Sequence, residues 1–545
     1  MEKNLKISGY IVDVVAERIF KGSLIISHGK IENIIEDDNI DCQQYIIPGF
    51  IDSHVHIESS MLTPANFAHE AIKHGTIACV ADPHEIGNVL GIEGVEFMIK
   101  NGEQSPMKFF FGAPSCVPAT EFETSGAKID ATDIEKLFKE GKVHYLAEMM
   151  NYPGVINNDP EVMRKIEIAH KYNKKIDGHA PAITGDDLKK YAQSGITTDH
   201  ECMSYQEAVE KIGLGMKIQI REGSAAKNFD DLIKLGKTHP QKTMLCSDDK
   251  HPDDLIKGHI NLLYKRAIDV GISPMEALKI CSLNPIKHYG LDVGLLQKGD
   301  SADFLLVNNL EELSINEVYI DGEKVFEKGN VLWSVPPLEE MPNNFQAKKL
   351  NVDDLKVEAK SENIRIIEIE DGQLYTKNII AKAKIEDGYA ISDTDEDILK
   401  IVVLNRYKPS EPQIAFIKNF GLKKGAIASS IAHDSHNIIS VGVDDIDIVN
   451  SINSIIEAKG GISVSSSNGT EILPLPIAGL MSNLDAKTVA QKYEELDKLA
   501  KQLGTKLSAP FMTLAFMSLL VIPEIKLGDK GLFDCINFSF IELFA

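Results

Sequence analysis

Apolar and polar positions follow two different patterns along the first 335 residues of this 545-residue chain. Around residues 5–47 and 299–325, short runs alternate apolar with polar side chains and stop at turn pairs such as Asp321-Gly322, which is typical of β-hairpins. From about Pro48 to Leu283, short apolar runs alternate instead with segments of helical periodicity. Eight apolar runs of this middle region are the predicted strands: Phe50–Val55, Thr76–Ala81, Lys108–Gly112, His144–Ala147, Lys175–Gly178, Thr197–Asp199, Lys217–Arg221 and Thr243–Ser247.

These patterns predict an α/β fold built on a barrel. Eight strand–helix units in roughly 240 residues are what a (β/α)8 TIM-like barrel requires, and we assign it to residues 48–289. A doubly wound parallel sheet is the alternative. Residues 1–47 and 290–335 flank the barrel and are expected to join in one small β-sandwich, because the ends of an inserted domain lie close together. A proline-rich polar stretch then predicts a linker, and residues 350–545 predict a C-terminal α+β domain.

Composition narrows the range of partners. The formal net charge of −24 disfavours binding to nucleic acid or to an anionic membrane surface. The longest apolar run, Phe511–Pro523, is shorter than the roughly 20 residues that a membrane helix needs. Seven cysteines without a C-x-x-C pair indicate reduced thiols. We therefore expect a cytoplasmic protein, a homo-oligomer, that binds a small molecule and neither nucleic acid nor membrane.

Residue types that bind metal ions recur where predicted strands end. His54 and His56 close the first strand and, because side chains alternate with a period of two, face the same side. Four later strands end in further candidate ligands: Glu148, His179, His200 and Asp248. Because the carboxyl ends of barrel strands meet at one face, the sequence predicts a metal site there.

The size of this ligand set indicates two ions. Four imidazoles and two carboxylates exceed the needs of one tetrahedral ion, whereas two ions roughly 3.5–4 Å apart and bridged by a carboxylate would use them all. Glu148, on the middle strand of the series, is the predicted bridge. Imidazole and carboxylate ligands without thiolate suit Mn²⁺, Fe²⁺ or Zn²⁺.

Several segments resemble a known family. PGFIDSHVHIESSM at 48–61, GHAP at 178–181, TDHE at 198–201 and CSDD at 246–249 are similar to the amidohydrolase superfamily. ADPHEIGNVLG at 81–91 and KKGAIASSIAHDSHNI at 423–438 resemble, more narrowly, bacterial adenine deaminases. The resemblance covers nearly the whole chain, including its C-terminal part.

The resemblance implies both the chemistry and the ligands. Five side chains are implied as metal ligands: His54, His56, His179, His200 and Asp248. Glu148 stands where many superfamily members bridge two ions with a carbamylated lysine. The implied reaction, part of purine salvage, hydrolyses adenine to hypoxanthine and ammonia by a metal-activated hydroxide, with a binuclear Mn²⁺ centre expected and Fe²⁺ or Zn²⁺ as alternatives. Glu148 would handle the proton that N1 of the ring gains, and Asp248 would take the proton from the water and pass it to the amine. If only one ion is bound, His200 would instead polarise the substrate.

Further candidates surround this set. Asp82, His84 and Glu85 follow the second strand, where they either cap a helix or support the metal ligands, or hold an extra ion. Three polar residues close the seventh strand and either contact the purine or, in the case of the arginine, form an ion pair: Arg221, Glu222 and Ser224. His433 and His436 lie outside the barrel, on a loop that either closes over the barrel mouth or is solvated.

Two rival functions stay open at this point. The first is another amidohydrolase that acts on a related purine or a cyclic amide, which would differ only in its pocket. The second is a non-catalytic, metal-binding homologue. The complete set of six ligand types argues against the second.

Overall fold

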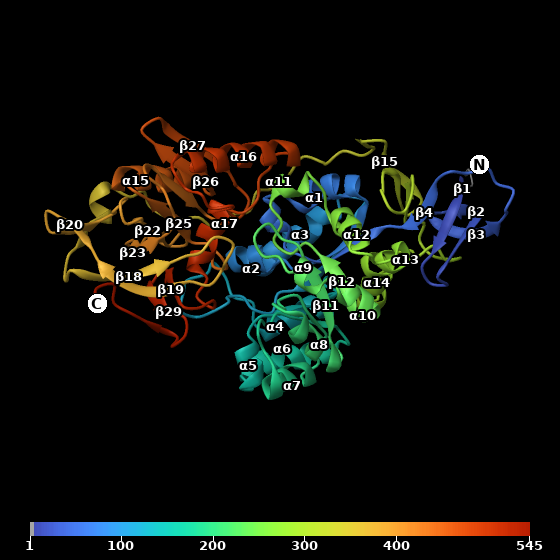
Figure 1. The fold of residues 1–545 in the computed structure, drawn as a ribbon, viewed down its shortest axis with the longest axis horizontal. Coiled ribbons are helices and arrows are strands. Elements are labelled where there is room, and N and C mark those ends of the chain that lie inside the picture. The colour runs from blue at the N-terminus through green and yellow to red at the C-terminus, as the bar shows by residue number, and fades with distance from the viewer. Residues whose placement is uncertain (1–4) are drawn as a thin grey trace.

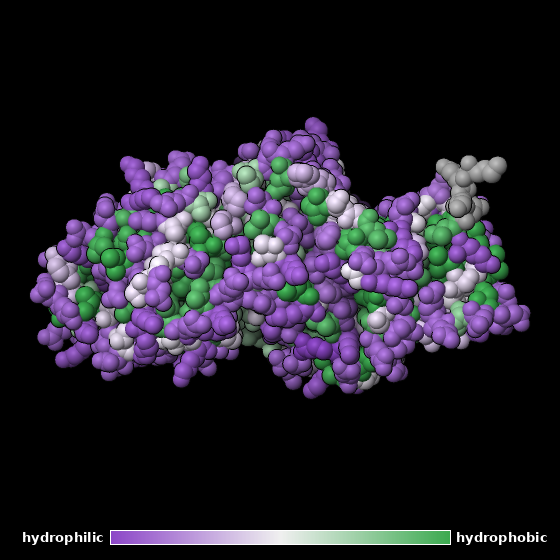
Figure 2. All heavy atoms as spheres, turned by 90° about the horizontal axis from the view of Figure 1, so that it is seen from above, coloured by the Kyte–Doolittle hydropathy of each residue, from purple (hydrophilic) through white to green (hydrophobic). Residues whose placement is uncertain are grey.

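The computed structural model describes residues 5–545 and has three parts along its longest axis (Figure 1). A β-sheet built from strands before and after the barrel lies at one end, the barrel lies in the middle, and the C-terminal part lies at the other end. The face seen in Figure 2 is mostly hydrophilic with small apolar patches. Across the described residues, no helix is both long and apolar enough to cross a membrane.

The middle part is a closed parallel barrel. Its strands are β5 (Phe50–Val55), β6 (Thr76–Ala81), β7 (Lys108–Ala113), β8 (Tyr145–Met149), β9 (Ile176–Gly178), β10 (Thr198–Asp199), β11 (Lys217–Arg221) and β12 (Thr243–Cys246). The Asp248 N–H donates to the His54 carbonyl at 3.0 Å and thereby joins the last strand to the first. The Thr197 N–H donates to the Ile176 carbonyl at 2.9 Å and joins the two hydrogen-bonded sets of strands, β5–β9 and β10–β12. The predicted barrel is confirmed, and the doubly wound sheet is wrong.

Helices follow the strands and cover the outside of the barrel. They include α1 (Pro64–Ala71), α3 (Ile92–Gly102), α4 (Ala131–Lys139), α6 (Pro160–Lys171), α7 (Gly185–Gln193), α8 (Tyr205–Gly213) and α12 (Ile260–Asp269). Local sequence sets their ends: Asp159 caps α6 by accepting from the Glu161 and Val162 N–H groups, with Pro160 at the first helical position. Helix α2 (His84–Leu90) begins instead at the barrel mouth, directly after β6.

The segments that flank the barrel share one eight-stranded sheet. Its order is β16 (Asn330–Val331), β15 (Glu323–Glu327), β14 (Ile315–Ile320), β13 (Phe304–Val307), β4 (Tyr45–Pro48), β1 (Leu5–Asp13), β2 (Arg18–Ser27) and β3 (Lys30–Glu36). Antiparallel pairing of β4 with β13 joins the chain before the barrel to the chain after it. The sheet curls until the Ala302 N–H donates to the Gly29 carbonyl, around a core that includes Leu24, Ile46 and Phe304.

The C-terminal part has a second eight-stranded sheet. Its order is β19 (Lys377–Lys382), β18 (Asn363–Glu368), β23 (Gln413–Lys418), β22 (Ile398–Leu404), β25 (Ile438–Gly442), β24 (Ala426–Ser429), β26 (Gly461–Ser466) and β27 (Gly469–Pro474). Helices α15 (Asp445–Ala458), α16 (Ala486–Gln502) and α17 (Pro510–Ala515) pack with it. The chain between β24 and β25 reaches the barrel mouth, where it completes the site described next.

Candidate metal centre

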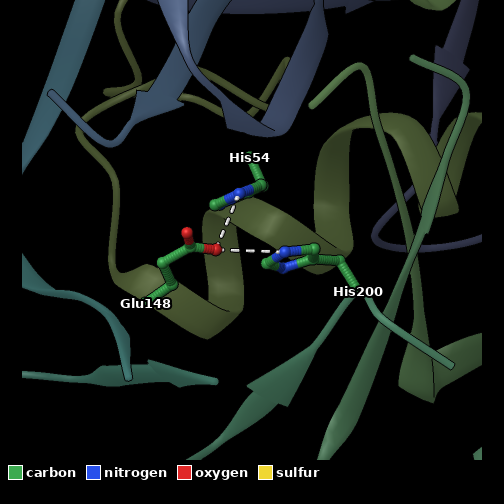
Figure 3. A group of neighbouring side chains, drawn as sticks. All are labelled: His54, Glu148 and His200. Atoms are coloured by element: carbon green, nitrogen blue, oxygen red, sulfur yellow. Dashed lines mark ion pairs between the residues drawn. The ribbon is translucent and has the colours of Figure 1, made fainter. Parts of the chain in front are cut away.

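Six side chains from five strand ends converge at the mouth of the barrel. His54 is on β5, and His56 follows it. The other four are at or just beyond the ends of β8, β9, β10 and β12: Glu148, His179, His200 and Asp248. Figure 3 shows His54, Glu148 and His200 turned toward one another from separate elements. Five of the six are almost fully buried, and the His179 side chain is 21% exposed. The structure therefore brings together all six predicted ligands.

The two histidines at the end of β5, His54 and His56, form one group of ligand atoms with Asp248. The Nε2 atoms of His54 and His56 are 3.2 Å apart. Asp248 Oδ1 lies 3.6 Å from His54 Nε2 and 3.3 Å from His56 Nε2. Three nitrogen and oxygen atoms that face one point at these separations can share a single cation.

Glu148 belongs to this group and to a second one. Its Oε2 lies 3.1 Å from both His179 Nδ1 and His200 Nε2, and 3.6 Å from His54 Nε2. Its Oε1 lies 4.0 Å from His56 Nε2. A carboxylate between two sets of imidazoles has the position that a bridge between two cations requires.

The donor set fits divalent cations. Among the described residues, the Nδ1 atoms of His54 and His200 are buried without a hydrogen-bond partner, and both Nε2 atoms point into the cluster. Burial and the nearby imidazoles of His200 and His56 lower the pKa of His54 well below its ordinary value. Against the effect of burial, neighbouring carboxylates raise the pKa of His56, and raise that of His179 to about 9, so a bound cation would take the place of protons on these two rings. Neutral imidazoles and ionised carboxylates are the forms that bind Mn²⁺, Fe²⁺ or Zn²⁺.

A buried arginine holds Asp248. Arg221 Nη1 lies 2.7 Å from Asp248 Oδ2, and the guanidinium forks onto both carboxylate oxygens of Glu201, with Nη2 at 2.9 Å from Oε2. Burial alone would raise the pKa of Asp248, but the charge of Arg221 and a hydrogen bond to His56 hold it well below its ordinary range. The ion-pair alternative predicted for Arg221 is therefore what its contacts show.

Glu201 is a site residue that sequence analysis missed. Its Oε1 lies 3.5 Å from His200 Nε2 and 3.6 Å from His179 Nδ1. The available signal was its position, directly after His200 and the strand β10. Glu222 and Ser224, by contrast, turn to other partners, since Glu222 pairs with Arg266 at 2.8 Å and Ser224 donates to Asp254.

The segment after β6 supports the metal ligands. His56 Nδ1 lies 3.1 Å from the Asp82 carbonyl, to which it donates, and this contact orients the ring with Nε2 toward the other metal ligands. Asp82 Oδ2 accepts the Glu148 N–H at 3.2 Å, and His84 Nδ1 lies 3.7 Å from Glu148 Oε1. Asp82 Oδ1 also accepts the N–H of His84, the first residue of α2, at 3.1 Å, so contact with the start of the helix and support of the metal ligands coexist.

The loop of the C-terminal part docks onto Glu85. His433 Nδ1 lies 2.7 Å from Glu85 Oε1, and His436 Nε2 makes a short contact with Oε2. The Ala432 N–H donates to His436 Nδ1, so Nε2 is the protonated atom that donates to Glu85. His433 and His436 are buried, which shows that the solvated alternative is wrong and that the loop does close on the barrel mouth.

Comparisons with known proteins agree over the whole chain. The amidohydrolase family model matches residues 45–325, and the model described as the adenine deaminase C-terminal domain matches residues 373–539. The chain is 52% identical to an adenine deaminase of Methanosarcina barkeri, over 98% of this chain and 99% of that protein. It is 50% identical to an adenine deaminase of Parabacteroides distasonis, over 100% and 99%. It is 47% identical to one of Salinibacter ruber, over 100% of both.

Proposed function

The chain belongs to the adenine deaminase family of amidohydrolases, and from this premise we propose that it hydrolyses adenine to hypoxanthine and ammonia. The observation that carries the proposal is the convergence of six ligands, with Glu148 between two groups, at the mouth of a family barrel. Relatives that match over the full length support adenine as the substrate.

We propose a pair of divalent cations, Mn²⁺ in the native enzyme. His54, His56 and Asp248 would hold one ion, His179 and His200 the other, and Glu148 would contact both. Such cations would lower the pKa of a bound water and supply the nucleophile near neutral pH. Fe²⁺ and Zn²⁺ are the alternatives that this donor set also suits.

The chain's own carboxylates handle the protons. Attack at C6 destroys the aromaticity of the ring, so N1 must accept a proton and the amine must gain one to leave as ammonia. We assign the N1 proton to Glu148, which lies at the centre of the cluster. We assign the water proton and its transfer to the amine to Asp248, whose Oδ1 faces the ligand histidines while Arg221 holds Oδ2.

Neighbouring residues act by positioning. Arg221 and Glu201 fix the orientation of Asp248, and the Asp82 carbonyl fixes the ring of His56. His84 and Glu85 lie between Glu148 and the C-terminal loop, so His433 and His436 help to order this side of the mouth. We therefore infer that the C-terminal part is required for full activity.

Turnover of adenine tests the proposal directly. The purified chain, supplied with Mn²⁺, is expected to release ammonia from adenine and to shift its ultraviolet spectrum toward that of hypoxanthine. Guanine, adenosine and a cyclic amide such as dihydroorotate serve as competing substrates. Faster turnover of any of these would favour the rival amidohydrolase function, and metal binding without turnover of any would favour a non-catalytic homologue.

We further propose that the enzyme works in purine salvage in the cytoplasm. All seven cysteines are unpaired, which suits a reducing compartment. The homo-oligomeric state expected above is also a proposal, which light scattering of the purified protein tests. Limited proteolysis within residues 335–351 tests the proposed three-part division of the chain.

A further inference from the structure

The loop between β24 and β25 brings an unsatisfied carboxylate to the barrel mouth. Asp434 is 4% exposed, and its Oδ2 has no hydrogen-bond partner among the described residues. The preceding His433 is bound to Glu85, whose Oε1 lies 3.6 Å from His84 Nε2. His84 in turn lies 3.7 Å from Glu148. Three side chains, those of His433, Glu85 and His84, thus connect the position of Asp434 to the predicted metal bridge.

Two other acceptors lie beside the start of α2, at residues 84–88. Glu58 Oε1 accepts the Ile86 N–H at 3.1 Å, and Asn88 Nδ2 donates to the His84 carbonyl at 3.0 Å. Within the described part of the chain, the remaining oxygens, Glu58 Oε2 and Asn88 Oδ1, are buried without a donor. Buried acceptors without donors cost free energy, and native proteins rarely leave them so. Of these unmatched acceptors, Asp434 is the one that a chain of side-chain contacts, through His433, Glu85 and His84, connects to Glu148.

The charge on Asp434 is consistent with a missing donor. Burial raises the pKa of its carboxyl to about 6, and the nearby carboxylate of Glu85 adds to the effect. The charges of His84 and Glu148 also act on it, which agrees with the contact path described above. The charges of His84 and His433 stabilise the anion but do not offset the cost of its burial, and no hydrogen-bond donor among the described residues reaches Oδ2.

We propose that Asp434 accepts a hydrogen bond from the N–H of the imidazole ring of the purine and thereby selects the free base. The inference rests on the proposed function, in which C6 of adenine faces the metal ligands. The ring N–H is then on the opposite edge of the base. A nucleoside carries its sugar at N9, on that edge. A carboxylate there would therefore bind the free base more tightly than the nucleoside.

The test compares two inhibitors that differ in one N–H group. Purine has the ring N–H and no amine to lose; a thiazolopyrimidine of the same shape keeps the nitrogen at position 7 and has sulfur in place of the N–H at position 9. The Mn²⁺-loaded enzyme is expected to bind purine at least tenfold more tightly than the thiazolopyrimidine, as a hydrogen bond to a charged group implies. In Asp434→Ala the ratio is expected to fall below about threefold, and in Asp434→Asn, which keeps a neutral acceptor, to an intermediate value.

Asp529→Asn is the matched control. Asp529 is also a buried carboxylate at the junction with the barrel, where it accepts the Thr124 N–H at 2.8 Å and the Asn405 side chain at 2.7 Å. This variant is expected to keep the full inhibitor ratio. If Asp434→Ala does not fold, Asp434→Asn decides alone, with bound Mn²⁺ measured in each sample.

The outcomes separate this inference from the proposed function. Wild-type turnover of adenine together with an unchanged inhibitor ratio in the Asp434 variants would overturn the inference and leave the function standing. Failure of the wild-type enzyme to deaminate adenine would overturn both. A ratio that falls equally in Asp529→Asn would show a general effect of the junction and would likewise overturn the assignment to Asp434.

Discussion

Replacing Arg221 is expected to destabilise the barrel mouth strongly. Its guanidinium is buried between two carboxylates, with Nη1 at 2.7 Å from Asp248 and Nη2 at 2.9 Å from Glu201. In Arg221→Met both carboxylates would keep their burial and lose their fixed counter-charge. Removing one partner of a buried ion pair costs about 3–5 kcal/mol. For a barrel of this size that corresponds to a fall in Tm of roughly 6–20 °C.

Arg221→Lys tests the geometry apart from the charge. Lysine keeps one positive charge but loses the fork that reaches Glu201 and Asp248 together. We expect it to recover part of the stability and little of the turnover, because Asp248 would no longer be held in one orientation. Adenine turnover at saturating substrate and the bound Mn²⁺ per chain should be measured on the same samples.

Thermal unfolding after chelation is the assay, since bound metal would mask the loss. Arg266→Met is the control, because Arg266 also pairs with two carboxylates, Glu222 and Asp230, but is 35% exposed. Exposed pairs contribute about 0–1 kcal/mol, so its Tm should change little. An Arg221→Met protein that unfolds within about 2 °C of the wild type would refute the reasoning, since the same relation assigns that shift at most about 1 kcal/mol.

Three further changes test other parts of the account. Glu148→Gln is expected to lower turnover of adenine at least about 100-fold, as loss of a general acid–base group does, and normal turnover with both metals bound would exclude its role. The pKa of His433 is raised to about 9, since the charge of Glu85 outweighs the effect of burial. The ion pair of His433 therefore contributes its full stabilisation below pH 6.5, and this contribution is lost as the pH rises through 9. Between pH 7 and 10, the Tm of the wild type should fall more than the Tm of His433→Gln. Parallel curves of Tm against pH for the two proteins would contradict this. Gly178→Ala would bring a Cβ to 2.4 Å from the Thr198 carbonyl oxygen, and it should lower the free energy of unfolding by about 1–3 kcal/mol. Urea unfolding measures this change. An unchanged midpoint would show that the neighbouring strands move apart at little cost.

The barrel and its ligands could be predicted because their signals are local. Each strand is a short apolar run, and each ligand stands where such a run ends. The alternation of side chains put His54 and His56 on one side, and the barrel rule put the later strand ends at the same mouth. The observed strands begin and end within two residues of the predicted ones.

Contacts between distant segments could not be predicted in this way. Glu85 and His436 are 351 positions apart, and no periodicity relates them. The partner of Arg221 could not be predicted for the same reason. An arginine at a strand end can contact a bound ligand or pair with a buried carboxylate, and the sequence does not distinguish the two. Glu201 was visible in its motif, but only the structure showed that it lies between Arg221 and the histidines.

The central claim is that the six converging side chains hold a catalytic pair of cations, and a Mn²⁺ titration of the chelated enzyme tests it most directly. Chelation is expected to abolish adenine turnover, and the activity should return in proportion to added Mn²⁺ until two equivalents per chain are bound. Full activity after thorough chelation, or complete recovery at a single equivalent, would contradict the account.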